Sequence, residues 1–427
     1  MNTAVMILGG VGFFALLMAS VALHEVGHMV PAKLFGVKVP KFFVGFGPTL
    51  WSIKRGETEY GIKWIPLGGF VQLLGMYPPR NPAAKPSSWQ RFADDARAAE
   101  WEDISPGDRG RLFYERSTLK KLIIMFGGPA MNLVIAFVLL WGIVGLHGIS
   151  RSTSDVYDVA PCVITEVRDD YTCTDADPVS PASQAGLQAG DRIVSFNGVA
   201  VDGYDELGEL IRANLGQPAT IVVERSGQTV TLPTVNTIVQ QVPSDIDPGR
   251  LVEVGYLGFY PVREVVTGGP GDALVQMGQM VQQSAVALAQ FPVKIWNVAV
   301  DLVTGQPRDV NGPVSIVGVS AIAGQATATA EVSFGAKVVL FANLLAAVNL
   351  FLALFNLVPL PPLDGGHMAG ALWEAVKRGW ARLVRRPDPG FVDTARMLPV
   401  AYAVGGLLLL CGLVVIVADI VTPISIF

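Results

Sequence analysis

Four long stretches without a charged residue constrain this chain of 427 residues more than any other feature. Each holds roughly 20 mostly apolar residues, the length that a helix needs to cross a bilayer. The stretches are residues 4–23, 122–147, 338–357 and 397–418. Hydrophobic residues make up 51% of the chain and charged residues only 16%, which excludes an ordinary soluble enzyme. The sequence therefore predicts a polytopic α-helical membrane protein with four transmembrane helices.

Two further stretches are apolar but less suited to a bilayer. Residues 273–293 carry five glutamines, which favours an amphipathic or surface helix. Residues 310–330 are rich in Gly, Ser and Thr, so we expect them to lie outside the bilayer or to graze it. Neither stretch is counted among the predicted spans.

The first apolar stretch ends in His24-Glu25-Val26-Gly27-His28, an H-E-x-x-H motif. On a helix, two histidines four residues apart lie on one face and suit a single zinc ion (Zn2+). Glu25, beside the first histidine, is placed to act as general base toward a water molecule at such an ion. The sequence therefore predicts a metal-hydrolase site at the end of a membrane helix.

Asp364 is the predicted third ligand, because a catalytic zinc usually has three protein ligands. Three prolines end the third apolar stretch before Asp364, and two glycines follow it. An acidic side chain in such apolar surroundings is costly unless it is paired or bound to a metal, which indicates a functional role. The alternative is an aspartate that caps a helix. We expect one zinc ion per chain, held by His24, His28 and Asp364.

The charges predict how the chain is oriented. No Lys or Arg precedes the first stretch, while Lys33 and Lys38 follow it, which is opposite to a cleavable signal peptide. Residues 151–337 carry a net charge of -11 and the remainder +6. The positive-inside rule then places both termini and residues 151–337 outside, with the zinc site near the cytoplasmic face. The three ligands meet only if the number of crossings between His28 and Asp364 is even.

Residues 38–46 and 59–74 contain short β-like runs beside the predicted metal site. An unpaired strand edge there would suit an extended peptide as an added strand. The alternative is an ordinary hairpin that covers the helix end. Residues 78–118 are polar and of mixed charge, which indicates a cytoplasmic loop.

A second compact unit is predicted from strand-like runs in residues 158–235. Within it, residues 180–198 read SPASQAGLQAGDRIVSFNG and closely resemble a bacterial PDZ domain. PDZ domains commonly bind a peptide as an added strand, although a plug or spacer that binds no peptide is also open. Cys162 and Cys173 lie in this unit and would pair only in an oxidising compartment, so their state is left open. Cys411 lies in an apolar segment, where inert packing is expected.

The fold class predicted is thus four transmembrane helices with a membrane-associated β-hairpin or sheet and an extracytoplasmic PDZ domain (α+β). The predicted boundaries are 1–31 for the first transmembrane helix, 32–77 for the β region, 78–118 for the cytoplasmic loop, 119–148 for the second transmembrane helix, 155–240 for the PDZ domain, 241–336 for an extracytoplasmic or amphipathic connection, 337–368 for the third transmembrane helix, 369–396 for a cytoplasmic basic loop and 397–421 for the fourth transmembrane helix.

The combination of these motifs resembles the site-2 protease family of intramembrane zinc metalloproteases, in particular its bacterial RseP-type members. A single PDZ-like unit resembles the actinobacterial branch. The resemblance implies His24, His28 and Asp364 as zinc ligands and Glu25 as the catalytic base. It also implies that Asn356 holds the substrate backbone or the reacting carbonyl. Further positions that match family motifs are Gly68, Gly69 and Phe70 in a substrate-clamping strand, and Gly128, Pro129 and Asn132 in the second span, where we expect close helix packing with one buried amide.

The resemblance implies an intramembrane endopeptidase in the bacterial cytoplasmic membrane. Its substrates would be single-pass membrane proteins, such as anti-sigma factors already cut outside, in stress-response signalling. A related role is the clearance of remnant signal peptides. Partners would be these substrates, the lipid bilayer and a peptide ligand of the PDZ domain, with no nucleic acid. The alternatives are a membrane-anchored PDZ adaptor with a vestigial metal site and a zincin that acts on the outer face.

Overall fold

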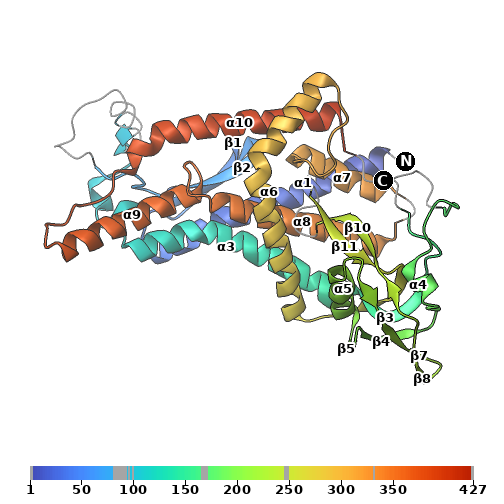
Figure 1. Cartoon of the computed structure of the whole chain (residues 1–427). Helices are drawn as coiled ribbons and strands as arrows, with labels where there is room; N and C mark the ends of the chain where they lie inside the picture. The colour runs from blue at the N-terminus through green and yellow to red at the C-terminus, as the bar shows by residue number, and fades with distance from the viewer. Residues whose placement is uncertain are drawn as a thin grey trace. The chain divides into compact units, whose positions relative to one another are not determined.

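The computed structural model describes residues 3–79, 94, 97–98, 101–164, 172–244, 250–329 and 332–424. The chain divides into two compact units (Figure 1). We call Met1–Gly142 together with Gly271–Phe427 the helical unit, and Ile143–Pro270 the sheet unit.

The helical unit consists mainly of long apolar helices. They are α1 (Thr3–Leu34), α3 (Thr118–Gly142), α6 (Pro270–Thr304), α7 (Ile316–Ala328), α8 (Phe334–Asn356), α9 (Asp364–Leu383) and α10 (Leu398–Val421). Within the described residues, five helices are long and apolar enough to cross a membrane: α1, α3 with its extension to His147, α6, α8 and α10 with the turn before it. The chain is thus a multi-pass membrane protein, and four of these helices coincide with the predicted spans.

The fifth helix, α6, is longer and more apolar than the sequence suggested. Its best window has a mean hydropathy of 1.4, against 2.2 or more for the other four, because glutamines interrupt its apolar residues. Only 6% of that window is buried. Figure 1 shows α6 running steeply across the direction of α3 and α10. A helix over 273–293 is therefore confirmed, but it is 35 residues long and apolar enough to cross a membrane, which the expected surface helix was not.

The third span ends where the prolines predict. Helix α8 stops at Asn356, and α9 begins at Asp364, so Asp364 is the first residue of a new helix. The predicted third transmembrane segment, 337–368, is therefore two helices joined by a Pro-rich turn. The predicted basic loop, 369–396, is wrong over most of its length: α9 continues to Leu383, because its apolar and charged residues alternate with helical periodicity.

Small residues bring the helices of this unit close together. A Cβ atom on Gly27 of α1 would lie 2.2 Å from the carbonyl oxygen of Gly127 in α3. A Cβ on Gly324 of α7 would lie 2.4 Å from the carbonyl oxygen of Met6 in α1. Backbones approach this closely only where no side chain intervenes, which is the usual way in which membrane helices pack.

Strands β1 (Lys41–Arg55) and β2 (Thr58–Gln72) form the sheet of the helical unit, as predicted for residues 32–77. Their register pairs Lys41–Val44 with residues 59–62 on one side and with residues 69–72 on the other. Within the described part of the chain, no strand pairs with the second edge of residues 69–72. This β segment is therefore an edge strand.

Only part of the predicted cytoplasmic loop, 78–118, falls within the described residues. There it contains the short helices η1 (Pro106–Asp108) and η2 (Phe113–Glu115). The amino group of Lys38 binds both carboxylate oxygens of Asp108 at 2.9 Å, and the Ser105 hydroxyl donates to the same carboxylate. These hydrogen bonds hold the pKa of Asp108 at about 2 and fix the segment beside the start of β1.

The sheet unit has its own apolar core around an antiparallel sheet. Its strands and helices are η3 (Ile143–His147), β3 (Ile149–Val159), α4 (Pro181–Gln184), β4 (Arg192–Phe196), β5 (Val199–Ala200), α5 (Tyr204–Ala213), β6 (Pro218–Ala219), β7 (Ile221–Arg225), β8 (Gln228–Thr231), β9 (Val235–Asn236), β10 (Ile238–Pro243), β11 (Leu251–Tyr256) and β12 (Phe259–Val266). The main sheet has the order β12-β3-β4-β7-β8, with β5 beside β4. Phe196, Leu207 and Ile221 are among its fully buried side chains.

This unit is wider than the predicted limits of 155–240. Strand β12 pairs with β3 along most of its length, so residues up to Val266 belong to the same sheet. The predicted connection, 241–336, therefore begins within the sheet unit and continues as α6 and α7. Cys162 and Cys173 form a disulfide bond, which the sequence alone had left open.

Candidate metal centre and active site

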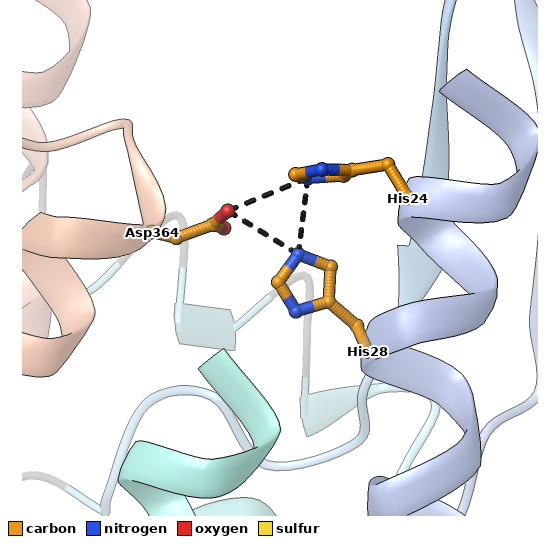
Figure 2. A group of neighbouring side chains, drawn as sticks. All are labelled: His24, His28 and Asp364. Carbon is orange, nitrogen blue, oxygen red and sulfur yellow. Dashed lines mark hydrogen bonds and ion pairs between the residues drawn. The ribbon is translucent and has the colours of Figure 1, made fainter. Parts of the chain in front are cut away.

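The two histidines of the H-E-x-x-H motif lie on one face of α1, as their spacing predicts. Their Nε2 atoms are 3.3 Å apart. The Asp364 carboxylate reaches them from the start of α9, with Oδ2 at 3.5 Å from His24 Nε2 and 3.2 Å from His28 Nε2. Figure 2 shows the three side chains converging from two separate elements. Among the described residues this is the one cluster of three such side chains that could hold a metal ion.

The spacing of these three atoms fits zinc. Nitrogen and oxygen ligands at about 2.0–2.1 Å from a tetrahedral zinc lie about 3.3–3.4 Å from one another. The three observed separations, 3.2 to 3.5 Å, bracket this value. Oδ2 of Asp364 is buried and has no hydrogen-bond partner among the described residues, as expected for a ligand atom. Three protein ligands leave one tetrahedral position for water or substrate.

His28 is held in the orientation that a ligand needs. Its Nδ1 atom lies 2.8 Å from the carbonyl oxygen of Ile124 in α3. A carbonyl oxygen only accepts, so Nδ1 carries the proton and donates, and Nε2 keeps its lone pair for the metal. The α1–α3 contact thus fixes both the ring orientation and the tautomer of this ligand.

Gly128 of α3 makes room for the metal. A Cβ atom at this position would lie 2.2 Å from Nε2 of His28 and 2.6 Å from Nε2 of His24. These are the two atoms that face the ion, so any side chain at Gly128 would occupy the space where a metal binds. The sequence predicted helix packing for this glycine. The structure adds a second reason for glycine here, which is that the metal site needs the space that a side chain would fill.

Glu25 lies beside the edge strand of the helical unit. A Cβ atom on Gly69 would lie 3.2 Å from Cγ of Glu25, so the strand backbone approaches the predicted base closely. Both residues line a cavity of about 640 Å³ that also contains the three ligands. A peptide in this cavity would therefore meet the edge strand, the base and the metal position together.

The structure brings most of the predicted site residues to this cavity. Its lining includes Gly68, Gly69 and Phe70 of the edge strand, Asn356 at the end of α8, and Asn132 of α3. Pro129 is buried in α3 and is not among the lining residues, in keeping with its predicted packing role.

Other lining residues were not predicted. His367 and Tyr77 lie at the border between this cavity and a second one of about 310 Å³ beside α10. Leu17, Val21 and Leu352 form apolar walls on α1 and α8. The position of His367, three residues after Asp364 and hence one turn along α9, is the one signal in the sequence that could have indicated it.

Comparison with known proteins agrees with this geometry. The chain matches peptidase family M50 over residues 12–384. This covers most of the chain and all three ligands, so the chain belongs to this family, the site-2 proteases, as predicted. It is a zinc metalloprotease with Zn2+ as its cofactor.

Individual relatives are similar along their whole length. The chain is 35% identical to "Zinc metalloprotease Rip1" of Mycobacterium tuberculosis, an RseP-type protease, over 99% of this chain and 100% of the relative. It is 34% identical to the protein of the same name in Mycolicibacterium smegmatis, over 98% of each chain. A "Putative zinc metalloprotease" of Clostridium acetobutylicum is 28% identical over 95% of each.

Proposed function

We propose that this zinc metalloprotease is an intramembrane endopeptidase that cleaves the transmembrane segments of single-pass membrane proteins, anti-sigma factors already cut outside among them. The observation that carries the proposal is the position of the metal ligands. His24 and His28 lie in a helix apolar enough to cross a membrane, and their cavity is walled by apolar side chains of that helix and of α8.

Hydrolysis requires a base beside the attacking water. When bound, zinc lowers the pKa of a water molecule to about 7 and polarises the peptide carbonyl as a Lewis acid. Glu25 accepts the proton of that water and delivers it to the leaving amine. The amide of Asn356, at the end of α8, donates to the carbonyl oxygen as negative charge develops on it.

The edge strand supplies the means of holding a substrate. A helical substrate hides its carbonyl groups in its own hydrogen bonds, so it must be unwound before cleavage. Residues 69–72 line the cavity next to Glu25, and no described strand pairs with their second edge. We infer that the unwound substrate pairs with this edge as an added strand, with Gly68, Gly69 and Phe70 at the pairing site.

The proposed location is the bacterial cytoplasmic membrane, with the sheet unit and both termini outside and the zinc site near the cytoplasmic face. The charge asymmetry of the sequence supports this orientation. The Cys162–Cys173 disulfide supports it independently, because disulfides persist in oxidising compartments. We propose that the sheet unit is a PDZ domain that binds a peptide.

The meeting of the three ligands also limits the role of α6. If His28 and Asp364 lie at the same depth, an even number of crossings separates them. Helix α6 alone would make that number odd, so α6 and α7 cross together or neither crosses. The glutamines of α6 and its lower mean hydropathy favour the second arrangement, which gives four spans.

The decisive experiment is Glu25→Gln in the purified full-length protein. We expect the variant to keep its zinc, measured by atomic absorption, and to lose cleavage of a single-pass anti-sigma fragment reconstituted in detergent. Glu209→Gln, on the exposed face of α5, is the matched control and should cleave as the wild type does. Undiminished cleavage by the Glu25 variant would mean that the cleavage does not come from this site, and would overturn the proposal.

A further inference from the structure

Asn132 carries a buried amide that no described residue pairs with. Its side chain is 1% exposed, and neither Oδ1 nor Nδ2 has a hydrogen-bond partner among the described residues. Buried polar side chains are almost always hydrogen-bonded, and a buried group left unpaired destabilises the fold. An amide that serves only helix packing would be expected to find a partner on a neighbouring helix.

The amide lies in the catalytic cavity. Asn132 is four residues after Gly128 on α3, so both lie on one face of the helix, about 6 Å apart along its axis. Gly128 faces the Nε2 atoms of His24 and His28, and Asn132 itself lines the cavity. Its unpaired atoms are therefore one helical turn from the metal position, on a wall that neither the edge strand nor α8 forms.

We propose that the Asn132 amide binds the backbone of the unwound substrate next to the scissile bond, with Nδ2 donating to a carbonyl oxygen and Oδ1 accepting from an N–H group. This inference rests on the proposed intramembrane cleavage. It assigns Asn132 to substrate binding, whereas the sequence indicated only packing.

The chemistry of the cavity supports this assignment. The backbone groups of an extended peptide point to both sides of the strand, and the edge at residues 69–72 can satisfy those on one side only. Leu17, Val21 and Leu352 line the cavity with apolar surface, where an unpaired peptide group is costly. A side-chain amide offers a donor and an acceptor together, so it can pair with the backbone N–H and C=O groups of the substrate that face away from the edge strand.

The test compares the same substitution at two buried asparagines. Asn132→Leu removes an unpaired amide, so we expect an unchanged or higher Tm, full zinc content and a fall in kcat/KM of about 10- to 100-fold for the anti-sigma fragment. Asn349→Leu is the control. Asn349 is fully buried, accepts from the Ser20 hydroxyl at 2.5 Å and donates to the Leu345 carbonyl at 2.8 Å, so its replacement should lower Tm.

A second measurement separates binding of the peptide from binding of the metal. The affinity of Asn132→Leu for a peptide hydroxamate should fall by about tenfold, and that for acetohydroxamate, which contacts the metal alone, should not change. Three results would overturn the inference: cleavage by Asn132→Leu at the wild-type rate, a fall in Tm as large as that of Asn349→Leu, or an equal loss of affinity for the two hydroxamates. Cleavage by Glu25→Gln would instead overturn the proposed function, so the two failures are distinguishable.

Discussion

The sheet unit and the helical unit bury their residues in different ways. The sheet unit encloses large apolar side chains, including Phe196 and Leu207, as soluble domains do. The helical unit encloses large apolar side chains as well, Phe13 and Leu17 among them, but its helices also meet backbone to backbone, as Gly27 of α1 and Gly127 of α3 do. Lipid is as apolar as leucine, so membrane helices gain from shape and close contact more than from removing apolar surface from water.

The comparison explains where the metal centre lies. The closest contact of α1 with α3 is also where His28 is oriented by Ile124 and where Gly128 faces both imidazoles. One helix crossing therefore serves packing and ligand geometry at once. The sheet unit, by contrast, contributes none of the three ligands.

The largest effect is expected from a substitution that disrupts the contact between α1 and α3. Gly128→Leu places a side chain where the metal binds, so we expect zinc content to fall to background and cleavage to fall by about a hundredfold or more. The protection of amides in the sheet unit, measured by hydrogen–deuterium exchange, should not change. Gly142→Leu is the control, because a Cβ atom on this α3 glycine meets nothing within 4 Å. Full zinc content in Gly128→Leu would contradict the assigned metal position.

The second prediction breaks the sheet unit alone. Leu207 is fully buried in its core, so Leu207→Ala should lower the free energy of unfolding of this unit by about 2–5 kcal/mol. Exchange in β4 and β7 should accelerate, while zinc content should stay at one ion per chain, since no ligand belongs to this unit. A loss of zinc in this variant would show that the two units are coupled.

The third prediction replaces a glycine by alanine in each unit and expects changes in stability of opposite sign. Gly27→Ala forces α1 from α3, because the new Cβ meets a backbone oxygen, and should destabilise the helical unit by about 1–3 kcal/mol. Gly208→Ala in α5 meets only Tyr204 at an ordinary 3.7 Å and should stabilise the sheet unit by about 0.5–1 kcal/mol. Thermal unfolding, with hydrogen–deuterium exchange as the probe of each unit, measures both changes in stability. Equal signs would mean that the two packing modes do not differ.

The smallest expected effect concerns acid. Asp108 has its pKa lowered to about 2 by the hydroxyl of Ser105 and the ammonium of Lys38. Its stabilising contribution is therefore complete above pH about 4 and is lost as pH falls toward 2. Asp108→Asn should flatten the acid dependence of exchange near η1.

The sheet unit supplies the comparison for this measurement. Burial alone would raise the pKa of Asp191, but the two hydrogen bonds from the Arg225 guanidinium hold it below its usual value. Its acid dependence should be the same in wild type and in Asp108→Asn. An identical acid profile near η1 in the two proteins would mean that Asp108 makes no such contribution.

The sequence predicted the metal site better than the domain limits. Spacing alone placed His24 and His28 on one face, and the parity of crossings brought Asp364 to them. The reach of the sheet unit was missed because β12 is defined by its pairing with β3, about a hundred residues earlier. The unpaired amide of Asn132 was equally hidden, since hydrogen-bond partners belong to tertiary structure. Helix α9 was missed because basic residues such as Lys377 and Arg378 are as typical of a cytoplasmic loop as of the polar face of a helix.

The division of the ligands between α1 and α9 has a consequence during synthesis. His24 and His28 enter the membrane with the first helix, whereas Asp364 follows only after α3, the sheet unit and α8 have been made. A nascent or truncated chain holds two of the three protein ligands and cannot complete the tetrahedral site. The three-ligand site is therefore complete only after synthesis has passed Asp364, by which point the edge strand and α8 have already been made.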